Sequence, residues 1–142
     1  MKTQNYENHT RLVPGFHVIT SAAIVLLFVG SVVNLFHSAH SNLYSASLIV
    51  LIAVILGLFF AYIRIFPLRA QDRVIRAEEN LRHYVLTGKL LDSRLRMRQV
   101  IALRFAPDEE FVSLAKRAAE ENLSSKAIKK EIKNWRADYY RM

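Results

Sequence analysis

The stretch from Leu12 to Ile63 contains no lysine, arginine, aspartate or glutamate, and it limits the fold more than any other feature. In water, an apolar surface of this length would drive aggregation. A lipid bilayer accommodates it, because an apolar helix of about 20 residues crosses the hydrocarbon core. The stretch divides into two such lengths, residues 16–36 and 43–66, joined by the small or polar residues 37–42. The sequence therefore predicts a transmembrane helical hairpin over residues 16–66.

Positively charged residues flank only one side of this predicted hairpin. Lys2 and Arg11 precede the first span, and the segment between the spans has no lysine or arginine. Five arginines lie at or after the end of the second span: Arg64, Arg69, Arg73, Arg76 and Arg82. Because positively charged flanks stay in the cytoplasm, both termini are expected to be cytoplasmic. Residues 1–15 are polar and are expected to form a flexible cytoplasmic leader.

Small residues recur at helical spacing in both spans. In the second span they are Ala46, Ala53, Gly57 and Ala61, and in the first they are Ala23, Gly30 and Asn34. Small side chains let two helix backbones approach closely in lipid. We expect these two sets to form the seam of the hairpin, since short loops join packed neighbours. The alternative is a seam for another subunit.

Residues 67–88 are predicted to form a juxtamembrane helix that ends at Gly88. Whether this helix continues the second span through Pro67 or begins at Pro67 stays open, because proline is compatible with both. One apolar stripe follows a 4–3–4–3 rhythm: Ala70, Val74, Ala77, Leu81 and Tyr84. That rhythm is typical of a coiled-coil seam and predicts a parallel homodimer. The rival prediction is that the stripe packs on Met97, Ile101, Phe111 and Trp135 of its own chain.

Residues 89–142 are predicted to form a basic cytoplasmic domain of three short helices. The first is expected from Asp92 to about Arg104, the second from Pro107 to about Asn122, and the third from Ser124 or Ser125 to about Tyr139. The net charge of this region is +5, out of +8 for the whole chain. We expect one side of the third helix to form a basic face of Lys126, Lys129, Lys130, Lys133 and Arg136.

Common catalytic and cofactor motifs are absent from the sequence. The four glycines are too scattered for a phosphate-binding loop, and the lack of cysteine excludes thiolate metal sites. His37 and His40 are three residues apart, but two ligands are a weak metal signal. Glu79 and His83 are interpreted as a solvated pair. We therefore predict no enzyme activity, no cofactor, no metal and no catalytic residues.

The basic face has three candidate partners besides plain solvent. A protein partner or a plain solvated face is favoured, followed by the anionic headgroups of the bilayer, where each lysine contributes about 1 kcal/mol. Nucleic acid is the least favoured. The last two helices have the outline of a helix-turn-helix, but lysine contacts phosphate more readily than it reads bases.

Three segments resemble a family of small bacterial two-span membrane proteins of unknown function: QNYENHTRLVPGFH, FPLRAQDRVIRAEENLRHYVLTGKLLDSRL and KRAAEENLSSKAIKKEIKNW. The resemblance covers nearly the whole chain and implies a bacterial inner-membrane location. It supplies no catalytic residues. The chain is thus expected to be a non-enzymatic anchor, adaptor or accessory subunit. The alternatives are a membrane-tethered nucleic-acid-binding protein and an accessory component of a membrane transporter or enzyme.

Overall fold

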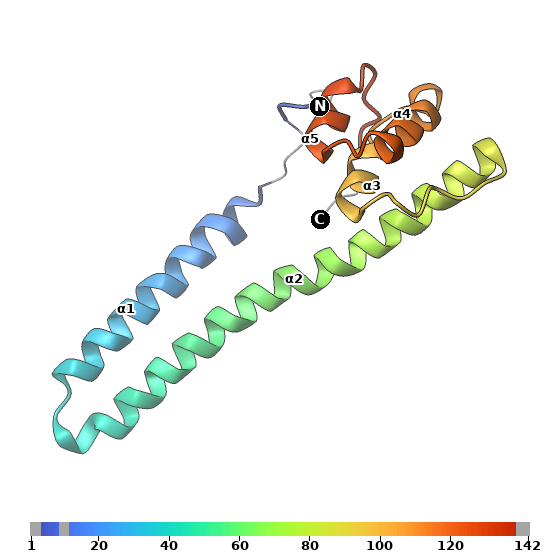
Figure 1. The fold of residues 1–142 in the computed structure, drawn as a ribbon. Coiled ribbons are helices and arrows are strands. Elements are labelled where there is room, and N and C mark those ends of the chain that lie inside the picture. The colour runs from blue at the N-terminus through green and yellow to red at the C-terminus, as the bar shows by residue number, and fades with distance from the viewer. Residues whose placement is uncertain (1–3, 9–11, 139–142) are drawn as a thin grey trace. The chain divides into compact units, whose positions relative to one another are not determined.

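The computed structural model describes residues 4–8 and 12–138, and within these ranges every regular element is a helix. The all-α prediction is therefore confirmed for the described residues. They form two compact units, one of residues 12–68 and the other of residues 69–138 with the described part of the N-terminus. The elements in chain order are the π-helix η1 (Gly15–Thr20), α1 (Ser21–His37), the 3₁₀ helix η2 (His40–Asn42), α2 (Leu43–Thr87), α3 (Met97–Leu103), α4 (Asp108–Glu120) and α5 (Ser125–Glu131) (Figure 1).

The first unit is a helical hairpin whose two arms are long and apolar enough to cross a membrane. The first arm, Gly15–His37, has a mean hydropathy of 2.3, and the second begins after the turn and reaches 2.8. At 1.5 Å per residue, the 23 residues of the first arm extend about 35 Å. In Figure 1, α1 lies beside the first half of α2. The rings of Phe16 and Phe60 stack with their centres 4.4 Å apart, so the two arms are in contact.

Helix α2 is continuous from Leu43 to Thr87 and contains Pro67. The question that the sequence left open is thus answered in favour of one long helix. Proline lacks an N–H, so only the hydrogen bond to the carbonyl of Ile63 is lost there. The helix ends where predicted, at Gly88, which has a φ of +73° and donates its N–H to the Tyr84 carbonyl at 2.7 Å.

The second unit has a small core, to which α2, α3, α4, α5 and their connections all contribute. The five largest fully buried side chains are Val100, Leu103, Phe105, Phe111 and Ile128. Ile75 brings α2 into this core, and Trp135 packs on its edge. The C-terminal part of α2 is therefore an integral part of the helical domain.

Helix α3 begins later than the sequence predicted, because its N-cap is Arg96 instead of Asp92 and its first residue is Met97. The Asp92 carboxylate does not cap a helix. It accepts hydrogen bonds from the side chain and the backbone of Arg94, which lower the pKa of Asp92 to about 2. The segment before α3 is held against α2, where Asn80 accepts from the Leu91 N–H and Arg76 donates to the Leu95 carbonyl. Tertiary contacts therefore replace the predicted first turns.

Helix α5 ends at Glu131, well before the predicted end near Tyr139, a residue outside the described ranges. The Glu110 carboxylate of α4 accepts hydrogen bonds from the backbone N–H groups of Lys133 and Asn134. These bonds to α4 take the place of helical ones. The 4–3 spacing of Ile128, Ile132 and Trp135 therefore does not mark one helix. Ile128 lies in α5, and the other two residues pack on the core from the segment after it.

Candidate functional site

The hairpin buries small residues on the inner side of α2. Ala46 and Ala53 are buried, and a methyl group added at Gly57 would lie 3.9 Å from the Ile24 side chain. On α1 the buried residue is Ser31, whose hydroxyl donates to the Phe28 carbonyl at 2.7 Å. This bond within the helix satisfies the hydroxyl, so a serine is tolerated on the packed side.

The other predicted seam residues are not brought into this contact. Ala23, Gly30 and Asn34 on α1 and Ala61 on α2 are exposed, and a methyl group added at Gly30 would meet no atom within 4 Å. On α1 the packed side is displaced by one residue, from Gly30 to Ser31. A serine whose hydroxyl is hydrogen-bonded within its own helix can pack against α2 as well as a glycine can. Residue size alone therefore could not show whether Gly30 or Ser31 lies on the packed side of α1. A seam for another subunit stays a prediction for these exposed residues.

The helical domain contains a buried ion-pair network centred on Arg82. Its guanidinium donates to Glu79 at 3.1 Å, to Asp108 at 2.6 Å and to the Ala106 carbonyl at 2.8 Å. It also lies over the Phe111 ring, 4.2 Å from the ring centre. One side chain of α2 thus binds the loop before α4 and contacts Asp108 and Phe111 in the first turn of α4.

The interpretation of Glu79 and His83 as a solvated pair is wrong. Glu79 is buried and pairs with Arg82, while the His83 Nδ1–H donates to the Lys89 carbonyl at 2.6 Å. The His83 ring also packs edge-on against Phe111. Both side chains lie on the face of α2 that the domain covers, and their contacts hold the domain on this helix.

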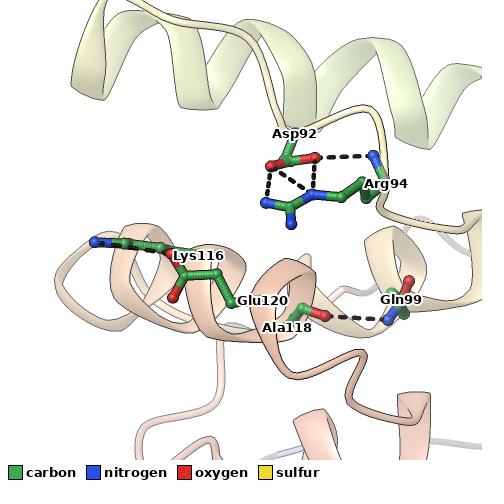
Figure 2. A network of polar contacts seen from close by, with 6 residues as sticks. All are labelled: Asp92, Arg94, Gln99, Lys116, Ala118 and Glu120. Atoms are coloured by element: carbon green, nitrogen blue, oxygen red, sulfur yellow. Dashed lines mark hydrogen bonds and ion pairs between the residues drawn. The ribbon is translucent and has the colours of Figure 1, made fainter.

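Gln99 is a second buried tether, and no feature of the sequence indicated this role. Its side-chain N–H groups donate to the carbonyls of Ala118 and Leu123, and its oxygen accepts from the Arg96 N–H. Figure 2 shows the bond to Ala118 beneath the Asp92–Arg94 pair and beside the exposed Lys116–Glu120 pair of α4. Gln99 therefore links α3 to the end of α4 and to the loop before α5.

A cavity of about 460 Å³ adjoins the buried network. Its walls carry both signs of charge, and Arg104 pairs with Asp138 at 3.2 Å. The lining residues are Gln71, Val74, Ile75, Glu78, Glu79, Arg104, Arg136, Ala137 and Asp138. The sequence did not predict this cavity, since its walls come from α2, the end of α3 and the chain after α5. Among the described residues no group of three or more His, Asp or Glu side chains is arranged to hold a metal.

Burial raises the pKa of Glu79 above its usual value of 4.5, against the opposing effect of Arg82. The folded state therefore binds the proton more tightly than the unfolded state, and ionisation of Glu79 reduces stability. Relative to the wild type, Glu79→Gln should gain stability as the pH rises from 4.5 through the raised pKa. Fluorescence of Trp135, the single tryptophan, reports unfolding in urea at each pH. A stability difference that is independent of pH would contradict this prediction.

The predicted basic face is divided between two kinds of structure. Lys126, Lys129 and Lys130 lie on α5, whereas Lys133 and Arg136 lie in the segment after it. The ammonium of Lys129 is 5.5 Å from the centre of the Phe105 ring. The other four side chains are exposed. The lysines thus remain on the surface, although one helix does not present all five residues.

The apolar stripe of α2 is exposed along its whole length. Ala70, Val74, Ala77, Leu81 and Tyr84 all lie on the surface, whereas Ile75 and Glu79 are buried. The rival prediction, that the stripe packs on the core of its own chain, is therefore wrong. The domain covers the opposite face of the helix.

Comparison with known proteins gives one match. Residues 1–142 match the sequence model of a family described as "Family of unknown function (DUF6526)". The comparisons with curated proteins and with solved structures found no match.

Proposed function

The chain belongs to DUF6526, a family of unknown function, and from its structure we propose that it is a non-enzymatic membrane adaptor. In this proposal, the hairpin spans the inner membrane of a bacterium with both termini in the cytoplasm. The helical domain is then held at the cytoplasmic face, where its exposed lysines bind an acidic protein partner. An accessory subunit of a transporter or membrane enzyme would be a special case of this adaptor, in which the acidic partner is the transporter or the enzyme.

The observation that carries the proposal is that α2 serves both units. Its first part is apolar and long enough to span a bilayer. Its last part contributes Ile75 to the domain core and Arg82 to the buried ion-pair network. Removing the anchor from α2 would therefore leave the domain dependent on a shortened helix. An anchor that is also part of the domain core suits a protein whose role is to hold that domain at a membrane.

The charge of the domain supports an acidic protein as the partner. Lys126, Lys130 and Lys133 are exposed, and no ion pair with Asp or Glu is formed by them within the described residues. The nucleic-acid alternative loses support because α5 has seven residues, about two turns, and a recognition helix needs more length to reach several bases. Anionic lipid is the remaining competitor.

Charge reversal on α5 tests the proposal. Lys126→Glu with Lys130→Glu should reduce the amount of acidic protein that co-purifies from native membranes by roughly tenfold, since exposed ion pairs contribute up to about 1 kcal/mol each. Quantitative mass spectrometry of the purified complexes measures the change. Lys89→Glu with Lys116→Glu is the matched control, because it changes the net charge equally at exposed positions outside α5.

Two outcomes would overturn the adaptor proposal. An equal loss in both double variants would show that net charge, and not the α5 surface, holds the partner. Loss of binding to vesicles with anionic lipid, without any change in co-purified protein, would assign the lysines to the membrane surface instead.

A further inference from the structure

The exposed stripe of α2 has the spacing of one side of a two-stranded coiled coil. Val74 and Leu81 occupy a positions of the heptad, and Ala70, Ala77 and Tyr84 occupy d positions. In this register Ile75 and Glu79 fall at positions b and f, on the far side of the helix. These are the residues that the domain buries. The fold therefore leaves the complete a/d seam open to another helix.

The charges beside the seam favour a second copy of the same helix in parallel. Arg73 occupies position g, and Glu78 occupies position e of the next heptad. In a parallel pair, each g residue faces the following e residue of the partner helix, so two Arg73–Glu78 pairs would form. Both side chains are exposed, and neither forms an ion pair within the described residues. An antiparallel pair would not bring these opposite charges together.

We propose that the chain forms a parallel homodimer through residues 70–84 of α2, with Arg73 of each copy paired to Glu78 of the other. The seam is weak in isolation, because two of its five residues are alanine and bury little area. The inference rests on the proposed membrane anchoring, which concentrates the copies and fixes them in a parallel orientation. The exposed Val74, Leu81 and Tyr84, which are 54%, 64% and 54% accessible in one chain, would become buried in the dimer.

Single cysteines test the contact and its orientation, since the chain has no native cysteine. Ala70→Cys and Tyr84→Cys, each expressed alone as the full chain in native membranes, should both form disulfide-linked dimers under mild oxidation. An antiparallel pair would place residue 70 near the opposite end of the partner's stripe, so neither variant would crosslink when expressed alone. Ser93→Cys, an exposed loop position outside the stripe of α2, is the control for random collision.

Charge exchange provides the second measurement. In the Ala70→Cys background, Arg73→Glu should raise the protein density needed for half-maximal crosslinking by about tenfold, because two attractive pairs become repulsive. Glu78→Arg should act in the same way. Combining Arg73→Glu with Glu78→Arg should restore the original protein density for half-maximal crosslinking. If either residue had only a structural role, the second change would not reverse the effect of the first.

Failure of the dimer and failure of the anchor are distinguishable in the same samples. A chain that stays in the membrane after alkaline extraction, without crosslinking above the Ser93→Cys control, overturns the dimer and leaves the anchor intact. A chain that leaves the membrane overturns the anchor. A double charge variant that crosslinks no better than the single variants contradicts the Arg73–Glu78 pairing.

Discussion

Replacing Arg82 with leucine will lower the free energy of unfolding of the helical domain by about 3–5 kcal/mol, the range found when one partner of a buried ion pair is removed. The side chains of Arg82 and Glu79 are only 11% and 8% exposed. The substitution leaves the Glu79 carboxylate buried without its cation and removes two further bonds, to Asp108 and to the Ala106 carbonyl. Since domains of this kind are stable by about 5–15 kcal/mol, much of the stability would be lost. Urea unfolding in detergent, followed by Trp135 fluorescence, measures the effect.

The matched control is Arg117→Leu. Arg117 also binds two carboxylates, those of Glu121 and Glu131, but its side chain is 49% exposed. Exposed ion pairs contribute about 0–1 kcal/mol, so this variant should unfold close to the wild-type urea concentration. Adding Glu79→Gln to Arg82→Leu should recover part of the lost stability, because no unpaired charge then remains buried. Equal destabilisation by the two arginine variants would refute the role of the buried network.

Features set by local chemistry could be predicted from the sequence. The two long apolar helices follow from length and hydropathy, and the two residues predicted to end helices, Gly88 and Asn122, have left-handed conformations with φ values of +73° and +50°. Ser124 caps α5 by accepting the Ala127 N–H. The helix ends and the cap depend on residues within one helical turn. The long apolar helices depend on the length and hydropathy of one continuous segment. Such rules do not need knowledge of distant parts of the chain.

Features set by contacts between distant residues could not be predicted. Asp92 and the residues after Glu131 follow good helical patterns, yet partners elsewhere determine their conformation. Glu110 lies in the first turn of α4, and its carboxylate accepts hydrogen bonds from backbone N–H groups 23 and 24 residues later. Gln99 is an ordinary helical residue in the sequence and a buried link between three segments in the fold.

The periodicity of the juxtamembrane helix identified the stripe but not the partner of that stripe. After Pro67, the apolar stripe of α2 consists of Ala70, Val74, Ala77, Leu81 and Tyr84. The domain instead covers Ile75, Glu79 and Arg82. The covered face is one that a hydrophobicity pattern would assign to solvent, since two of these three residues are charged. Charges are tolerated there because they are paired and hydrogen-bonded, which only the folded structure reveals.

Thiol accessibility in intact cells tests the central claim, a membrane hairpin with the domain in the cytoplasm, most directly. The chain is free of cysteine, so Ser41→Cys, in the turn between the two arms, and Ser93→Cys, in the helical domain, each introduce one exposed label site. A thiol reagent that cannot cross the inner membrane should label Ser41→Cys in intact cells almost completely, and Ser93→Cys only after the membrane is opened. Labelling of Ser93→Cys in intact cells, or equal labelling of both variants, would contradict the account.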